Sequence, residues 1–98
     1  MEQHEEQYEE KRKHLTRLAE ELAKHGFTAE RCGGIMHPCI RVTNPDPPQL
    51  TERVLCGQIK GESWSYLWPW MQPIGRVDDV ESAAAKIMTV LRSVEGES

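Results

Sequence analysis

The sequence predicts an α+β domain, an antiparallel sheet of three to four strands with an N-terminal and a C-terminal helix packed on one face. Both ends of the chain carry apolar residues at helical spacing, whereas the middle carries short alternating segments separated by connections of hairpin length. Connections this short join antiparallel strands, and the apolar stripe of each helix must be buried against something. The predicted order is therefore αββββα, in a single domain over residues 1–98.

The first helix is predicted over residues 1–25, which contain no glycine or proline. Leu15, Leu18 and Leu22 recur at helical spacing and form its apolar face. Gly26 follows the helix, and a glycine at this position can adopt the left-handed conformation that ends many helices.

The start of this helix, residues 1–12, is almost wholly polar, and we expect it to be a frayed or overhanging segment because it lacks a packing face. The alternative is one arm of a helix pair, since Tyr8, Leu15 and Leu22 are spaced by seven residues. In that case Tyr8 and Leu15 are candidate partner-binding residues. The histidines of this helix, including His14, are predicted to be solvated.

Four short strands are predicted in the middle of the chain, over residues 27–32, 39–43, 51–59 and 62–70. Gly33-Gly34 separates the first two, and Lys60-Gly61 is expected to form a tight hairpin between the last two. Residues 44–48 contain three prolines, which remove backbone donors and predict a rigid surface loop. Pro69 is expected at the end or the edge of the fourth strand.

The second helix is predicted over residues 79–94. Asp78, with Glu81 three residues later, resembles a capping box and is the predicted N-cap. One continuous apolar stripe follows, formed by Val80, Ala84, Ile87, Leu91 and Val94. Gly96 is expected to end the helix, and residues 95–98 are predicted to be a disordered tail.

The most specific local feature is a row of aromatic residues on one face of the fourth predicted strand, Trp64, Tyr66, Trp68 and Trp70. If this row faces the core, Ser63 and Ser65 meet water on the other side. If it lies on the open face of the sheet, it is a partner site, because Trp and Tyr dominate binding hot spots. A mixed arrangement, with the first two buried and the last two at the rim, also fits a strand that twists near Pro69.

Three cysteines, Cys32, Cys39 and Cys56, leave one thiol unpaired in any disulfide scheme, which favours a reducing compartment over a secreted framework. With His37 they could form a zinc site, but their spacing is unlike that of paired zinc ligands, so no metal or cofactor is predicted. A nucleophilic pairing of Cys39 or Cys32 with His37 lacks any indicated orienting group, so no catalytic residue is predicted. Cys56 is expected in the core.

Composition and charge argue against several classes of function. The net charge is -4, and the Lys and Arg residues form no basic stripe, so we expect no nucleic-acid role. No run of 18 apolar residues could span a membrane. The acidic start of the chain differs from the basic start of a signal peptide, so a cytoplasmic location is expected.

Residues 15–92 resemble small actinobacterial proteins of unknown function, through Pro38, Asn44-Pro45, Cys56, Trp64 to Trp70, Pro73 to Gly75, Asp78-Asp79, Ala83-Ala84, Ile87 and Val90 to Arg92. This resemblance implies no activity. A second resemblance, to the MbtH-like accessory proteins that bind adenylation domains, rests on Leu67-Trp68-Pro69 and the later Pro73 before a helix. The Asn, Glu and Gln pattern that precedes this motif in that family is absent, and Arg76 stands where the family has Trp, so only an analogy of fold is implied.

The expected function is that of a small cytoplasmic protein-interaction module without enzymatic activity, engaging an unknown protein or a second copy of itself. Only 19 of 98 residues are Leu, Ile, Val or Phe, and thinly cored small domains often gain burial by forming a homodimer. The candidate partner-binding residues are Trp64, Tyr66, Trp68, Trp70, Tyr8 and Leu15. The alternative is a small-molecule- or metal-binding domain, with enzymatic activity, around His37, Cys39 and the strand from Trp64 to Trp70.

Overall fold

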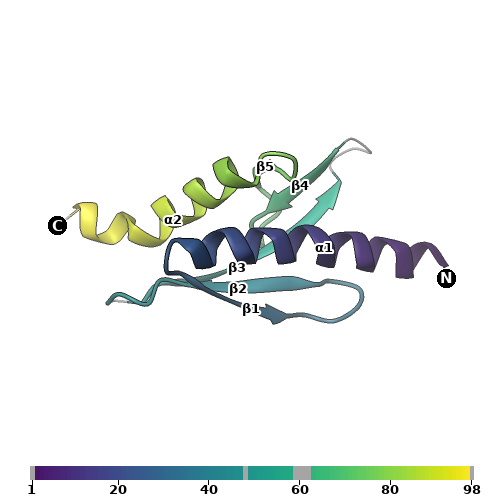
Figure 1. Ribbon diagram of the computed structural model, residues 1–98, viewed down its shortest axis with the longest axis horizontal. Coiled ribbons are helices and arrows are strands. Elements are labelled where there is room, and N and C mark those ends of the chain that lie inside the picture. The colour runs from purple at the N-terminus through teal and green to yellow at the C-terminus, as the bar shows by residue number, and fades with distance from the viewer. Residues whose placement is uncertain (1, 48, 59–62, 98) are drawn as a thin grey trace.

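Two helices and a five-stranded antiparallel sheet make up the fold (Figure 1). The computed structural model describes residues 2–47, 49–58 and 63–97, with side chains over 7–47, 49–58 and 63–92. In chain order the elements are α1 (Glu2–Lys24), β1 (Thr28–Cys32), β2 (Cys39–Thr43), β3 (Thr51–Gln58), β4 (Trp64–Leu67), β5 (Pro73–Arg76) and α2 (Val80–Glu97). Strand order in the sheet follows chain order, so the α+β prediction is confirmed, with five strands instead of three to four.

The fourth predicted strand, residues 62–70, is shorter in the structure, and Glu62 lies outside the described residues. β4 ends at Leu67, the chain reverses at Pro69, and β5 returns beside β4. Pro69 lacks the N–H that a ladder needs, and its fixed φ suits a turn. Trp68 and Trp70 therefore lie beyond the end of the strand, although the aromatic alternation of the sequence includes them. β5 was not predicted because it begins at Pro73, which is tolerated here since β5 is an edge strand.

The ends of the other strands lie close to the predicted ones. β2 has the predicted bounds, and β1 begins one residue late because Phe27 is buried at the end of α1. β3 ends at Gln58, and both Ile59 and the predicted Lys60-Gly61 hairpin lie outside the described residues.

Register divides the side chains of the sheet between two faces. One face carries Ile40, Val42, Val54, Cys56 and Tyr66, all of which join the core formed with the helices. The other face carries a row of directly paired residues, Cys39, Leu55 and Leu67, from β2, β3 and β4. We call this second face the open face, because no helix lies against it.

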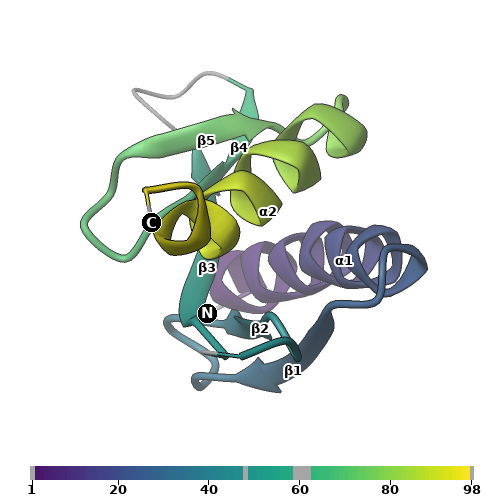
Figure 2. The ribbon, with the colours of Figure 1, turned by 90° about the vertical axis from the view of Figure 1, so that its left-hand side faces the viewer.

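Both helices pack on the same face of the sheet. Figure 2 shows the sheet curving around them, with β1 and β2 on one side and β4 and β5 on the other. α1 contacts β1, β2 and β3, whereas α2 contacts β5 and α1. The buried helix residues are Leu15, Leu18, Leu22, Ala83, Ala84, Ile87, Met88 and Leu91.

The end of α1 confirms the predicted glycine cap. Gly26 has a φ of 87°, and its N–H donates to the carbonyl of Ala23 at 3.0 Å. The N–H of Phe27 reaches back to the carbonyl of Leu22 at 3.1 Å. Two helix carbonyls are thereby satisfied, and the buried Phe27 ring fixes the direction in which the chain enters β1.

The ends of α2 differ from the prediction. Asp79, and not Asp78, is the N-cap, because its Oδ1 accepts from the N–H of Ser82 at 3.3 Å. At the other end α2 continues to Glu97, past Gly96, so residues 95–97 are helical instead of forming a disordered tail.

The proline-containing loop before β3 is anchored by Asn44. Pro45, Asp46 and Pro47 are exposed, as predicted for a surface loop, and Pro48 lies outside the described residues. Asn44 is buried, its Oδ1 accepts from the N–H of Asp46 at 3.0 Å, and its Nδ2 donates to the carbonyl of Leu91 at 3.3 Å. One side chain thus holds the loop together and ties it to α2.

Tyr66 and His14 connect the sheet to α1. Tyr66 is fully buried, its hydroxyl donates to the carbonyl of His14 at 2.7 Å, and burial raises its pKa. His14 is not solvated as predicted, because its ring packs 5.8 Å from the ring of Trp64 and its Nε2 lies 2.8 Å from a carboxylate oxygen of Glu10. The helix is too close to β4 at this point for His14 to reach solvent.

Truncating the buried stripe of α2 should destabilise the fold. We expect Ile87→Ala and Leu91→Ala each to lower the free energy of unfolding by about 2 to 5 kcal/mol, because each removes buried aliphatic atoms and leaves a cavity. Chemical denaturation followed by circular dichroism measures the change. The exposed Lys86→Ala, on the same helix, is the control and should have little effect. Unchanged denaturation midpoints in both core variants would contradict the packing described.

Candidate functional site on the open face

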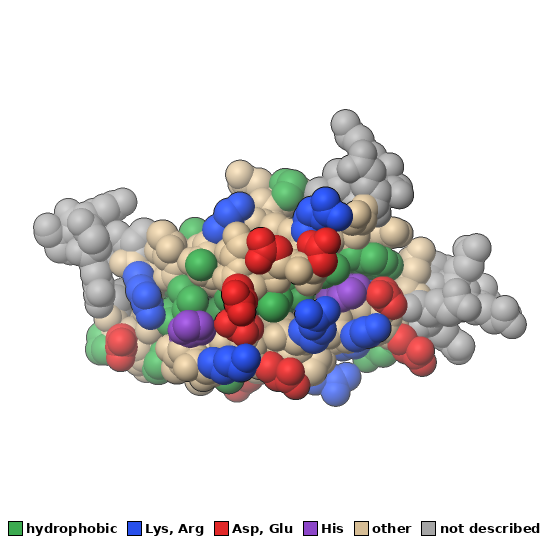
Figure 3. Space-filling model, turned by 45° about the horizontal axis from the view of Figure 1, so that its top comes forward, with side chains coloured by type: hydrophobic (Ala, Val, Ile, Leu, Met, Phe, Trp, Pro, Cys, Tyr) green, Lys and Arg blue, Asp and Glu red, His purple; other side chains and the backbone are tan. Residues whose placement is uncertain are grey.

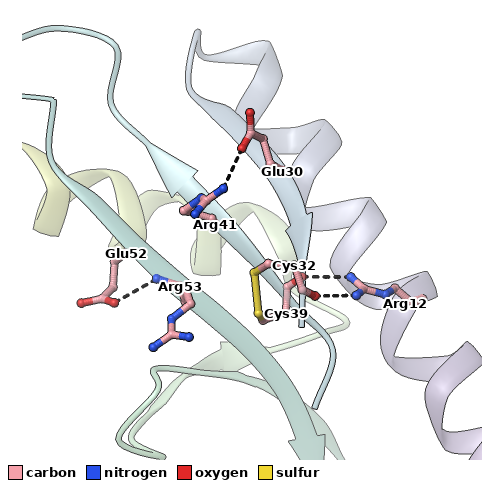
Figure 4. Close-up of a disulfide and its surroundings, with 7 residues drawn as sticks. All are labelled: Arg12, Glu30, Cys32, Cys39, Arg41, Glu52 and Arg53. Carbon is pink, nitrogen blue, oxygen red and sulfur yellow. Dashed lines mark hydrogen bonds and ion pairs between the residues drawn. A yellow bond between two sulfur atoms is a disulfide. The ribbon is translucent and has the colours of Figure 1, made fainter. Parts of the chain in front are cut away.

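A disulfide closes the loop between β1 and β2. Cys32 and Cys39 are directly opposite in the register, with Cα atoms 5.1 Å apart, and their sulfur atoms are bonded (Figure 4). The third cysteine, Cys56, is free and buried in the core, as predicted. The odd cysteine count is therefore no evidence for a reducing compartment, because two of the three cysteines form a disulfide, and disulfides persist more readily in oxidising compartments.

The loop inside this disulfide turns back sharply on itself. Gly33 has a φ of 75°, and a Cβ at this position would overlap the carbonyl oxygen of His37 and lie 3.2 Å from the Sγ of Cys39. Only glycine can adopt this positive φ without strain and also leave the space beside His37 and Cys39 free. The loop is thereby held over the start of β2, and its outermost residues are Ile35 and Met36.

Arg12 of α1 braces the two cysteines from the helix side. Its guanidinium donates to the carbonyls of Cys32 at 2.6 Å and of Cys39 at 2.9 Å (Figure 4). It also lies 5.6 Å from the ring centre of Tyr8, whose hydroxyl accepts from Arg31 at 3.4 Å. Arg12 and then Arg31 lower the pKa of Tyr8. The end of the polar segment predicted to overhang is therefore in contact with the sheet.

The turn between β4 and β5 places a second apolar group on the open face. The N–H of Met71 donates to the carbonyl of Trp68 at 2.8 Å, and the N–H of Trp68 donates to the carbonyl of Gln72 at 2.9 Å. This pattern, with Pro69 second in the turn, is that of a type I turn followed by a left-handed residue. Met71 occupies the left-handed position, with a φ of 68°, where glycine is usual.

Side chains from these two loops meet around Leu55. We define the open-face patch as Ile35, Met36, Leu55, Pro69 and Met71. Ile35, Met36 and Met71 are 64%, 58% and 61% exposed, although all three are large and apolar. A hollow of about 390 Å³ is lined by Met36, Leu55 and Met71 and also reaches α1, where Lys11 lines it. A second hollow of about 460 Å³ is lined by Ile35, Met36, Leu55 and Pro69. The two hollows adjoin, because both are lined by Met36, His37 and Leu55.

The aromatic row adopts the mixed arrangement only in part. Tyr66 is fully buried, Trp64 is half-buried, and Trp68, predicted at the rim, is also buried. Trp70 is 59% exposed, because it follows the turn at Pro69, and it stacks on Trp68 with ring centres 5.5 Å apart. Ser63 is exposed as expected.

Three further predictions about exposure can be compared with the structure. Ser65 is buried on the open face beside Leu67, and does not meet water as predicted. Leu15 and Tyr66 are core residues, so neither can belong to an exposed partner surface. Tyr8 is half-buried on α1 beside Arg12 and lines neither hollow of the open-face patch.

The apolar loop residues are the part of the site that the sequence interpretation missed. Ile35 and Met36 follow Gly33-Gly34 in a segment assigned to a break between strands, where polar residues are usual. Two consecutive large apolar residues in such a loop were the available signal. Met71 gave none, because it is next to the aromatic row and separated from Met36 by three strands.

The structure leaves little support for chemistry at His37 and Cys39. Cys39 is bonded to Cys32 and therefore has no thiolate to act as a nucleophile or a metal ligand. Burial raises the pKa of Cys56 to about 12, so its thiol stays protonated near neutral pH. Within residues 2–47, 49–58 and 63–97, no three His, Cys, Asp or Glu side chains are grouped to hold a metal ion.

Comparisons with known protein families, with curated proteins and with solved structures find no match to this chain. In the part of the chain that the structure describes, neither helix is long and apolar enough to cross a membrane. Inferences about function therefore depend on the geometry of the site.

The state of the cysteines can be measured directly. Without reductant, we expect the denatured chain to present one reactive thiol, that of Cys56, and with reductant three. In the native protein at about pH 8 that one thiol should be unreactive, because it is buried and protonated. Titration with a chromogenic thiol reagent measures the number of reactive thiols in the denatured, the reduced and the native protein. Three reactive thiols in the unreduced, denatured chain would contradict the disulfide.

Proposed function

We propose that this chain is a protein-interaction module that binds another protein through the open-face patch. The observation that carries the proposal is the grouping of exposed apolar side chains from two separate loops around two adjoining hollows. Most surface apolar residues are scattered singly, whereas a contiguous group on a small protein is typical of an interaction site.

The chemistry of the patch suits a protein ligand. Methionine is flexible and polarisable and adapts to varied apolar partners. Met36 and Met71 both line the first hollow, one from each loop. The disulfide and the brace from Arg12 hold one of these loops in place before binding, which reduces the entropy lost on association.

A small-molecule site is the weaker alternative. Small-molecule sites bury most of the ligand surface, whereas the main side chains of the open-face patch are more than half exposed. With Cys39 bonded to Cys32, neither hollow has a free Cys39 thiolate to act beside His37, so we propose binding without catalysis.

Capture experiments with matched variants test the proposal. The full chain is used to capture proteins from the source cells, beside Met36→Glu and the control Val90→Glu, which introduces the same charge at an exposed position on α2. We expect at least one protein to be retained by the wild type and by Val90→Glu and to be lost with Met36→Glu, because a carboxylate in the hollow must be desolvated on binding. Identical capture by all three would overturn the proposal.

Self-association is examined with the same variants. Sedimentation of the wild type at micromolar concentration shows whether the expected homodimer forms. If it does, and Met36→Glu alone abolishes it, the patch binds a second copy of this chain. A dimer that persists in Met36→Glu would place self-association elsewhere.

Met71 provides a variant that separates binding from folding. Met71→Gly should keep or raise the free energy of unfolding, by up to about 1 kcal/mol, because glycine adopts a φ of 68° without the steric penalty of a Cβ. The same variant should weaken capture of any partner that binds the patch, since it removes an exposed apolar side chain. Denaturation and capture are measured on one preparation. A variant that is less stable and binds normally would contradict the role given to Met71.

A further inference from the structure

Basic side chains border the open-face patch with no acidic side chain among them. Lys11 lines the first hollow and Arg53 the second, and no Asp or Glu of the described residues lines either. The chain as a whole has a net charge of -4. On the face of the molecule seen in Figure 3, acidic and basic side chains are interspersed. The charged side chains of the described residues that line the two hollows thus have the opposite sign to the net charge of the chain.

Arg53 has no carboxylate partner among the described residues. The Glu52 carboxylate accepts instead from the backbone N–H of Arg53 at 2.9 Å, and the guanidinium extends away from it (Figure 4). Arg41, which is opposite Arg53 in the register, is paired with Glu30 at 3.1 Å. Of these two neighbouring arginines on the open face, the one that lines the hollow is the one left unpaired.

Lys11, which lines the first hollow, also has no carboxylate partner among the described residues. It is half-buried on α1, and it forms no ion pair with any described residue, whereas Lys24, Arg41 and Arg76 each pair with a carboxylate. An apolar surface with an unpaired cation at each of its two hollows is complementary to an apolar ligand that carries negative charge on its flanks.

We propose that the open-face patch binds an apolar segment of another protein in which Asp or Glu residues flank the apolar ones. The apolar side chains of this segment would occupy the two hollows, and its carboxylates would pair with Arg53 and Lys11. The inference deepens the proposed function and rests on it, because it names the chemistry of the partner for the same patch.

The same charges disfavour other occupants. A symmetric dimer places one patch against its own copy, so cations of the same kind would approach across the interface, which opposes association. An anionic membrane surface is usually recognised by clusters of about four to eight Lys or Arg, and the hollows together have two.

Peptide selection tests the charge of the partner without knowledge of its identity. An unbiased displayed library of random peptides is selected on the intact wild-type chain and counter-selected on Met36→Glu, so that only patch-dependent peptides are kept. We expect the enriched peptides to combine aromatic or aliphatic residues with Asp or Glu and to be depleted in Lys and Arg. Enrichment of neutral or basic peptides would overturn the inference, and so would the absence of any patch-dependent peptide.

Charge reversal then tests the two cations. The best acidic peptide is titrated against the wild type, Arg53→Glu, Lys11→Glu and the control Arg17→Glu, an exposed arginine of α1 that lines neither hollow. We expect each patch variant to weaken binding by about tenfold or more, and Arg17→Glu to change it by about twofold or less. Equal affinities for all four proteins would overturn the inference. Such a result leaves the proposed function standing, because that depends on capture being lost with Met36→Glu.

Discussion

The sheet has two faces, and the chain has helices for only one of them. α1 and α2 both lie on the inner side of the curved sheet, where they form the core with β2 to β5. The opposite face still contains apolar residues, including the cross-strand pair Leu55 and Leu67. In the part of the chain that the structure describes, loops cover these residues. Loops 33–38 and 68–72 do so, leaving Leu67 only 3% exposed.

Covering a sheet face with loops requires that the loops be held in place. The disulfide ties the two ends of loop 33–38, and the guanidinium of Arg12 holds both cysteine carbonyls from the helix side. The turn at Pro69 holds the second loop through two backbone hydrogen bonds. Ile35, Met36 and Met71 are the side chains that remain outside.

Much of the fold could be predicted from local signals. Of the residues that line the hollows, His37, Cys39 and Trp64 were also singled out by the sequence, but the apolar loop residues were not. Helical periodicity and Gly26 predicted α1 and its end, and alternation predicted β2 to within a residue. β5 was missed because Pro73 argues against a strand unless the strand is known to lie at an edge, which depends on the whole topology. The patch was missed for a related reason. Met36 and Met71 meet only because the register places Cys39, Leu55 and Leu67 in one row.

The position of Met71 favours the proposed binding surface over incomplete coverage of the sheet. A loop that served only to cover Leu67 would be more stable with glycine at the left-handed position of its turn, because a Cβ is strained there. The residue at that position is instead a large apolar one that is 61% exposed, so it adds backbone strain and gains little burial within the chain. The nearby cations Lys11 and Arg53 likewise have no carboxylate partner among the described residues that would offset their charge. The strain at Met71 is unfavourable for the isolated domain, whereas the hydrated cations are close to neutral for its stability. Both features become favourable when an apolar, acidic segment covers the patch.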